Sequence, residues 1–294
     1  MSYERLLAIV LLVLLGCSAS VPEAKFHVLA SSGARILSTT GDTYARIVRL
    51  EQAFIVASMG DEKLTPDSFR PVVEGRSFDL EPELAFRQAA LGVLVKYLRV
   101  LEAFASSETD ADVDKASLEL GASLEGLMET AAISKERGAQ VSGILATGVD
   151  AIGREVSARQ RARALDRVMD ASQKDIERLA NLVAESHAKL DRAIDVMVGQ
   201  IVARANVVRP PPATVGRDEF YAALASTLRG AKEAHRALLA TAEAVKQIPV
   251  AHAQIRQTLA QTRAPLDALK TLAHKAEEAG TFYGSTQKTI GQTP

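Results

Sequence analysis

Three histidines are the residues of this chain best suited to bind a metal ion or a haem. His187, His235 and His252 fall on or beside the apolar stripes of segments with helical periodicity. Imidazole groups that face the interior of a helical bundle can ligate a metal. However, no two of them are four residues apart, and none belongs to a Glu-x-x-His sequence. The spacing therefore predicts histidines at the edges of helix seams, with no metal site and no cofactor.

The common catalytic motifs are missing from the sequence. It contains no His-Glu-x-x-His, no phosphate-binding Walker loop and no Gly-x-Ser-x-Gly nucleophile elbow. Long helices also form few concave pockets of the kind that hold substrates. We expect a protein that is not an enzyme and has no catalytic residues.

The only cysteine, Cys17, directly follows an apolar run of eleven residues, 6–16, which itself follows Arg5. A membrane-spanning helix needs about 20 apolar residues, so this run is too short to cross a bilayer. It has the length of the apolar core of a signal peptide. The residues at its end, Leu14-Leu15-Gly16-Cys17, resemble the lipobox of bacterial lipoproteins. An ordinary signal peptide cleaved near Ala19 is the alternative.

The resemblance to the lipobox has consequences for location. In bacterial lipoproteins the chain is cut before the cysteine, which is diacylated with fatty acids such as palmitate. Lipidation of Cys17 would leave no thiol for a disulfide or for catalysis. Ser18, rather than an aspartate, follows the cysteine, and the resemblance then implies sorting to the outer membrane rather than retention in the inner membrane. We expect a lipid-anchored protein of the bacterial cell envelope that faces the periplasm, with the lipid bilayer as a partner through acylated Cys17.

The composition predicts an all-α fold. No aromatic residue occurs between Phe104 and Phe220, and no proline between Pro82 and Pro210. A stretch of this kind, rich in Ala, Leu, Glu, Arg and Asp, is typical of long helices with narrow interfaces. The formal net charge is −1 and there is no basic tail or stripe, which argues against nucleic acid as a partner.

Two long helical segments follow from the apolar periodicity. Apolar residues recur at intervals of three and four over 139–205 and again over 217–279. Pro210-Pro211-Pro212 separates the segments, since three prolines cannot continue a helix. The pattern of the second segment survives Pro249, which predicts a kinked but continuous helix there, and Pro265 is a second bend or a break. We predict an elongated helical bundle with a long antiparallel, coiled-coil-like hairpin.

The same patterns divide the chain into five parts. Shorter helices are predicted at 42–59, from Pro82 onward and at about 111–134, packed alongside part of the hairpin. The predicted parts are a signal peptide at 1–16, a lipidated tether at 17–40, a short-helix bundle at 41–138, a long helical hairpin at 139–280 with a Pro-rich turn at 206–216, and a flexible tail at 281–294.

A basic cluster lies near the start of the first long helix. Arg159, Arg161 and Arg163 are its centre, with Arg154 and Arg167 on either side and acidic residues among them. Such a cluster can contact anionic lipid headgroups or an acidic partner. Charges of alternating sign on a long helix also form ordinary solvated faces.

Two classes of function are compatible with these observations. The favoured one is a non-catalytic helical scaffold that binds a protein partner or self-associates in the cell envelope. The alternative is a periplasmic sensor or ligand-binding bundle, in which the small side chains of 116–153 leave a cavity. A sensor needs an enclosed apolar pocket with a few convergent polar groups, whereas a scaffold needs an exposed apolar or charged stripe.

Overall fold

The computed structural model describes residues 22–58, 72–73, 76–77, 80–106, 110–132, 158–208, 216–260 and 267–290. The lipobox and Cys17 lie outside these residues, as do the first part of the first long segment, 139–157, the three consecutive prolines and Pro265. The predictions that concern them stay predictions.

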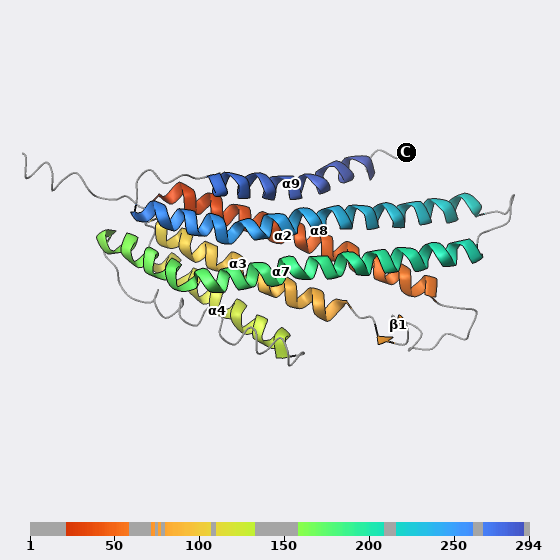
Figure 1. Ribbon diagram of the computed structural model, residues 1–294, viewed down its shortest axis with the longest axis horizontal. Helices are drawn as coiled ribbons and strands as arrows, with labels where there is room; N and C mark the ends of the chain where they lie inside the picture. The colour runs from red at the N-terminus through yellow and green to blue at the C-terminus, as the bar shows by residue number, and fades with distance from the viewer. Residues whose placement is uncertain are drawn as a thin grey trace, which may run out of the picture.

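The described residues form an elongated helical bundle (Figure 1). Its helices are α2 (Glu23–Ser58), α3 (Glu81–Ala105), α4 (Asp110–Ala132), α7 (Ala158–Val208), α8 (Arg217–Ala260) and α9 (Asp267–Ile290). The only strands among these residues are β1 (Val72–Val73) and β2 (Arg76–Ser77), which pair antiparallel with Val72 opposite Ser77. The predicted all-α fold is confirmed.

The long hairpin is confirmed as the centre of the bundle. Helices α7 and α8 lie side by side and antiparallel (Figure 1). The apolar residues that repeat at threes and fours along α7 are buried: Leu165, Val168, Ile176, Leu179, Val183, Leu190, Ile194, Met197 and Ile201. Gly216 precedes α8 with φ of 88°, a conformation that a glycine adopts without steric cost.

Helix α8 continues through Pro249, as predicted. Proline removes one backbone donor and usually kinks a helix, but the neighbouring Ile248 and Ala251 are fully buried and hold the chain in place on both sides. The helix ends at Ala260, and α9 turns back along α8 and also packs on α2 (Figure 1). Pro265 itself lies outside the described residues, between the end of α8 and the start of α9 at Asp267.

The tether predicted for 17–40 is wrong from Glu23 onward, because α2 begins there. Phe26, Leu29 and Ile36 are completely buried, and each such side chain contributes roughly 1.5–3 kcal/mol. The small residues that suggested a tether instead allow close packing. A Cβ atom placed on Gly33 would lie 2.8 Å from Leu98 Cδ1, so a larger residue at this position would push against the Leu98 side chain where α2 meets α3.

Two other boundaries differ from the prediction. Helix α9 runs to Ile290, so a flexible tail does not begin at 281. Its buried seam contains Leu272, Ala276 and Ala279. The bundle also does not divide near 138, because one cluster of buried residues contains side chains of α2, α3, α7, α8 and α9. Helices α2 and α3 pack against the hairpin, whereas α4 packs on α3 rather than alongside the hairpin as predicted.

Replacing Gly33 with leucine should lower the free energy of unfolding by roughly 1–3 kcal/mol, the usual cost of overpacking a core. Gly230→Leu is the matched control, since a Cβ atom there has no neighbour within 4 Å, and leucine has the higher helix propensity. Urea denaturation followed by circular dichroism measures both variants. Equal stability of Gly33→Leu and the wild type would contradict the close contact of α2 with α3.

Candidate functional site

The first polar site in the core joins three helices around Tyr97 of α3. Its hydroxyl lies 3.0 Å from Nε2 of His252 on α8 and 2.6 Å from Oγ of Ser172 on α7. His252 Nδ1 lies 2.7 Å from Oε1 of Gln173. We call Tyr97, Ser172, Gln173 and His252 the Tyr97 layer. Tyr97, Ser172 and His252 are at most 2% exposed, whereas Gln173 is partly exposed.

Hydrogen bonds of Gln173 determine the tautomer of His252. The amide nitrogen of Gln173 donates to Pro249 O and to Glu177 Oε1, so its carbonyl oxygen faces the imidazole. His252 Nδ1 must then donate to that oxygen. Burial, with a smaller effect of the Arg256 charge, lowers the pKa of His252 to about 3. The imidazole is therefore neutral at pH 7, and its bare Nε2 accepts the hydroxyl proton of Tyr97.

A second polar site lies further along the rod. The Tyr44 hydroxyl of α2 is 3.1 Å from Nε2 of His187 on α7. Arg87 of α3 is 2% exposed, and its charge acts on both residues. We call Tyr44, Arg87 and His187 the Tyr44 layer. Ser172 and His187 are fifteen residues apart on α7, so the two layers are separated by roughly 22 Å.

The Tyr44 layer contains buried donors that have no hydrogen-bond partner among the residues that the structure describes. Arg87 Nη2 donates to Glu83 Oε1 at 2.7 Å, but Arg87 Nε and Nη1 and His187 Nδ1 have no hydrogen-bond partner. Burial lowers the pKa of Arg87 to about 10, and burial together with the Arg87 charge lowers that of His187 to about 3. Burial also raises the pKa of the Tyr44 phenol. At pH 7 the layer holds one cation and two neutral rings.

The three histidines singled out in the sequence do not converge. His187 and His252 lie in different layers, while His235 pairs with Asp191 and is partly exposed. The prediction that all three lie at seam edges is wrong for His187 and His252, which are fully inside. Among the described residues, no group of three or more His, Cys, Asp or Glu side chains could hold a metal ion.

Sequence reasoning missed the tyrosine partners of these histidines. Neither Tyr44 nor Tyr97 is among the candidate site residues of the sequence. A usable signal was the pairing of residue types, because a buried tyrosine and a buried histidine each need a hydrogen-bond partner. Which tyrosine meets which histidine depends on the register of helices that are distant in the sequence.

The structure describes only part of the predicted basic cluster. Arg159 and Arg161 belong to the first turns of α7, where the structure describes the backbone alone, and Arg163 is exposed. The start of α7 and the start of α2 lie at the same end of the rod (Figure 1). Acidic residues near the cluster hold the hairpin together, because Arg256 of α8 pairs with Asp166 and Asp170.

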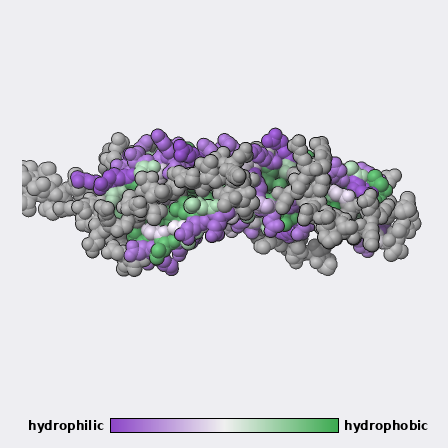
Figure 2. Space-filling model, turned by 90° about the horizontal axis from the view of Figure 1, so that it is seen from below, coloured by the Kyte–Doolittle hydropathy of each residue, from purple (hydrophilic) through white to green (hydrophobic). Residues whose placement is uncertain are grey.

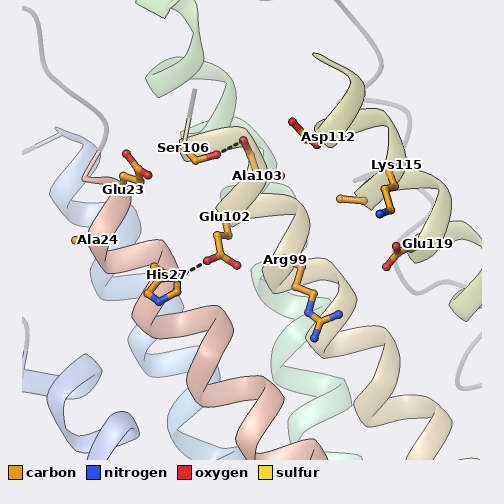
Figure 3. A pocket seen from close by; sticks show the side chains of 11 residues that line it. Glu23, Ala24, His27, Arg99, Glu102, Ala103, Ser106, Asp112, Lys115 and Glu119 are labelled. Carbon is orange, nitrogen blue, oxygen red and sulfur yellow. Dashed lines mark hydrogen bonds and ion pairs between the residues drawn. The ribbon is translucent and has the colours of Figure 1, made fainter. Parts of the chain in front are cut away.

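A surface pocket of about 610 Å³ lies at this same end, between α2, α3 and α4 (Figure 3). Charged side chains dominate its lining, among them Glu23, His27, Arg99, Glu102, Lys115 and Glu119. His27 Nδ1 donates to Glu102 Oε1 at 2.6 Å. We call this surface pocket the α2–α4 pocket. Its location is close to the cavity expected for a sensor, but its lining is charged rather than apolar.

The opposite end of the rod exposes apolar side chains. We define the hairpin tip as five residues where α7 ends and α8 begins: Val202, Val207, Val208, Phe220 and Tyr221. Val207 is 75% and Tyr221 41% exposed. Phe220 and Tyr221 contact each other edge to face, with Arg217 over the Tyr221 ring. Figure 2 shows hydrophobic residues on the surface toward this end.

Comparisons with known proteins add no relative. No protein-family model, no curated protein and no solved structure matches this chain. Within the described residues, no helix has the length and apolar character needed to cross a membrane.

Acidification should destabilise the fold through the two buried histidines. Their pKa is about 3 in the folded protein and about 6.5 when unfolded. The unfolded chain therefore binds more protons between these values, and stability falls as the pH drops through this window. At pH 4 the loss is roughly 3 kcal/mol for each histidine.

The test compares the free energy of unfolding at pH 7 and pH 4 in the wild type, His252→Gln and the exposed-site control His274→Gln. Glutamine does not ionise, so the difference between the two pH values should shrink by roughly 3 kcal/mol in His252→Gln only. An unchanged pH dependence of His252→Gln would show that His252 is not held neutral in the core.

Proposed function

We propose that the protein is a lipid-anchored, non-catalytic interaction protein of the bacterial cell envelope. Acylated Cys17 would hold it to the membrane, and the hairpin tip would bind a protein partner or a second copy. The observation that supports this proposal is the arrangement of the rod. Helix α2 begins at one end, six residues after Cys17, and the exposed apolar tip lies at the other end (Figure 1).

The length of α7 gives the reach of such a protein. Its 51 residues correspond to roughly 75 Å at the rise of an α-helix. Glu23 lies six positions after Cys17, and a fully extended chain covers at most about 20 Å over that distance. A partner at the tip could therefore lie well away from the membrane that holds the lipid.

The character of the tip favours protein binding. Aromatic and aliphatic side chains are the usual anchors of protein interfaces. At the tip they are carried by two helices that pack rigidly on each other, so little order has to be gained on binding. Arg163, by contrast, lies at the end where α2 begins, which favours anionic headgroups over a distal protein as the contact of the basic cluster.

The competing sensor function finds less support. It calls for an enclosed apolar pocket, whereas the α2–α4 pocket is an open pocket with a charged lining. The two polar layers are built from hydrogen-bonding side chains and are not apolar.

Replacing Cys17 with alanine should release the protein from the membrane fraction and abolish its labelling with palmitate. The wild-type protein should appear in the outer-membrane fraction. Ser18→Ala is the control, because it changes the neighbouring residue and leaves the thiol. If Cys17→Ala stayed acylated, or fractionated like the wild type, the lipobox interpretation would be wrong.

A photo-crosslinking amino acid at Val207 or Tyr221 should capture a partner in intact cells. The matched control is Val250, which is 49% exposed but lies in the last third of α8, away from the tip. We expect a discrete adduct from the two tip positions only, identified by mass spectrometry as another protein or as a second copy. Adducts from Val250 and none from the tip would contradict the role of the tip.

A further inference from the structure

One buried acceptor lies close to the unpaired donors of the Tyr44 layer. Asp191 follows His187 by four residues on α7, so their Cβ atoms lie about 5–6 Å apart on one face of the helix. Asp191 contacts the imidazole of His235 as an ion pair, but its Oδ1 atom is buried and has no aligned hydrogen bond within the described helices. An acceptor and a donor that both lack partners therefore share one turn of α7.

The hydroxyl of Tyr44 indicates which nitrogen of His187 carries the proton. Burial lowers the pKa of His187 to about 3, so the ring is neutral at pH 7 and has a single N–H group. If that proton were on Nε2, the Tyr44 hydroxyl proton and the bare Nδ1 would both need partners, and neither has one in the part of the chain that the structure describes. If Tyr44 donates to Nε2 instead, only the Nδ1–H group is left over. We therefore assign the proton to Nδ1.

Arg87 brings further donors to the same place. A guanidinium group can only donate hydrogen bonds, and this one is 2% exposed. Its Nη2 donates to Glu83, whereas Nε and Nη1 have no acceptor among the described residues. The Arg87 charge acts on both Tyr44 and His187, so the guanidinium lies near their hydrogen bond. Buried N–H groups without an acceptor are rare in folded proteins, and an ordered water molecule or ion commonly explains them.

The charges around this place select the chemistry of the ligand. An anion such as chloride could accept hydrogen bonds from Arg87 and His187, but the carboxylates of Asp191 and Glu83 would repel it. A cation could bind the carboxylates, but Arg87 would repel it. Water is neutral and both accepts and donates hydrogen bonds, and a buried water molecule typically makes about three of them. Water can therefore accept from His187 Nδ1 and donate to Asp191 Oδ1.

We propose that the Tyr44 layer binds an ordered water molecule, which accepts hydrogen bonds from His187 Nδ1 and Arg87 and donates one to Asp191 Oδ1. The water molecule would link α3 to α7 and would supply the acceptor that a buried guanidinium needs. It would also extend the layer from Tyr44 to the ion pair of Asp191 with His235. The site lies in the core, so it is independent of the lipid anchor and of the hairpin tip.

The Tyr97 layer provides an internal control. His252 is also buried and bonded to a tyrosine, but its Nδ1 donates to Gln173 Oε1 at 2.7 Å. Rotating-frame NOE spectra of the ¹⁵N-labelled, full-length Cys17→Ala chain at pH 7 should show a cross-peak between water and the Nδ1 proton of His187, and none for His252. The sign of the cross-peak separates a dipolar contact from proton exchange. The ¹⁵N shifts of His187 should show protonation at Nδ1.

Replacing Asp191 with leucine should abolish this cross-peak, because the change removes the acceptor and places an apolar side chain beside His187. His235→Gln is the matched control, since it removes the ion pair of Asp191 and leaves the carboxylate, so the cross-peak should remain. Circular dichroism shows whether each variant is folded. The wild-type comparison of His187 with His252 decides the matter if the leucine variant does not fold.

Each of the following results would overturn the proposal: no water cross-peak at His187, an equal cross-peak at His252, or protonation of His187 at Nε2. A cross-peak that survives in folded Asp191→Leu, or an equal loss in His235→Gln, would do the same. Crystals grown in bromide test the rival ligand, because an anomalous peak beside Arg87 and His187 would show an anion in place of water.

Discussion

The register of this bundle depends on two hydrogen bonds between a buried tyrosine and a buried histidine. The remaining seam residues are mostly Ala, Leu, Val and Ile, whose burial is non-directional and by itself selects only weakly against a shift of one heptad. Such a shift would leave the hydroxyls of Tyr44 and Tyr97 and the imidazoles of His187 and His252 without partners. Each unsatisfied buried group costs about 1–3 kcal/mol, so the two layers together select one alignment.

Small residues and the polar layers have complementary effects on the packing. Gly33 brings α2 against α3 near Leu98, and Tyr97 lies in the same region of α3 with its hydroxyl directed at α7 and α8. A close approach of the helices is needed for one phenol to reach both Ser172 and His252. Gly33 therefore affects the spacing of α2 and α3, whereas the hydrogen bonds of Tyr97 fix the axial position of α3 relative to α7 and α8.

The helical fold and the hairpin could be predicted from the sequence, because the apolar period along α7 and α8 is local information. The start of α2 could not be predicted from the sequence. Ser31, Ser32 and Gly33 have the composition of a linker, and their helix depends on packing against α3. The Tyr97 and Tyr44 layers also could not be predicted from the sequence. Their members lie up to 155 residues apart, and the pairing of long helices is decided by tertiary contacts rather than by any local pattern. The histidines were noticed for their chemistry, but their depth in the core depends on neighbours that periodicity does not identify.

The separation of the two ends restricts how they can influence each other. The α2–α4 pocket and the hairpin tip lie at opposite ends of a rod whose longest helix measures roughly 75 Å, so no residue can contact both. Coupling would have to pass through a sliding or rotation of α7 against its neighbours. The two polar layers oppose that motion, because each would lose its hydrogen bonds in the core. The bundle is therefore better suited to be a rigid spacer that holds its two ends at a fixed distance than to be a switch between them.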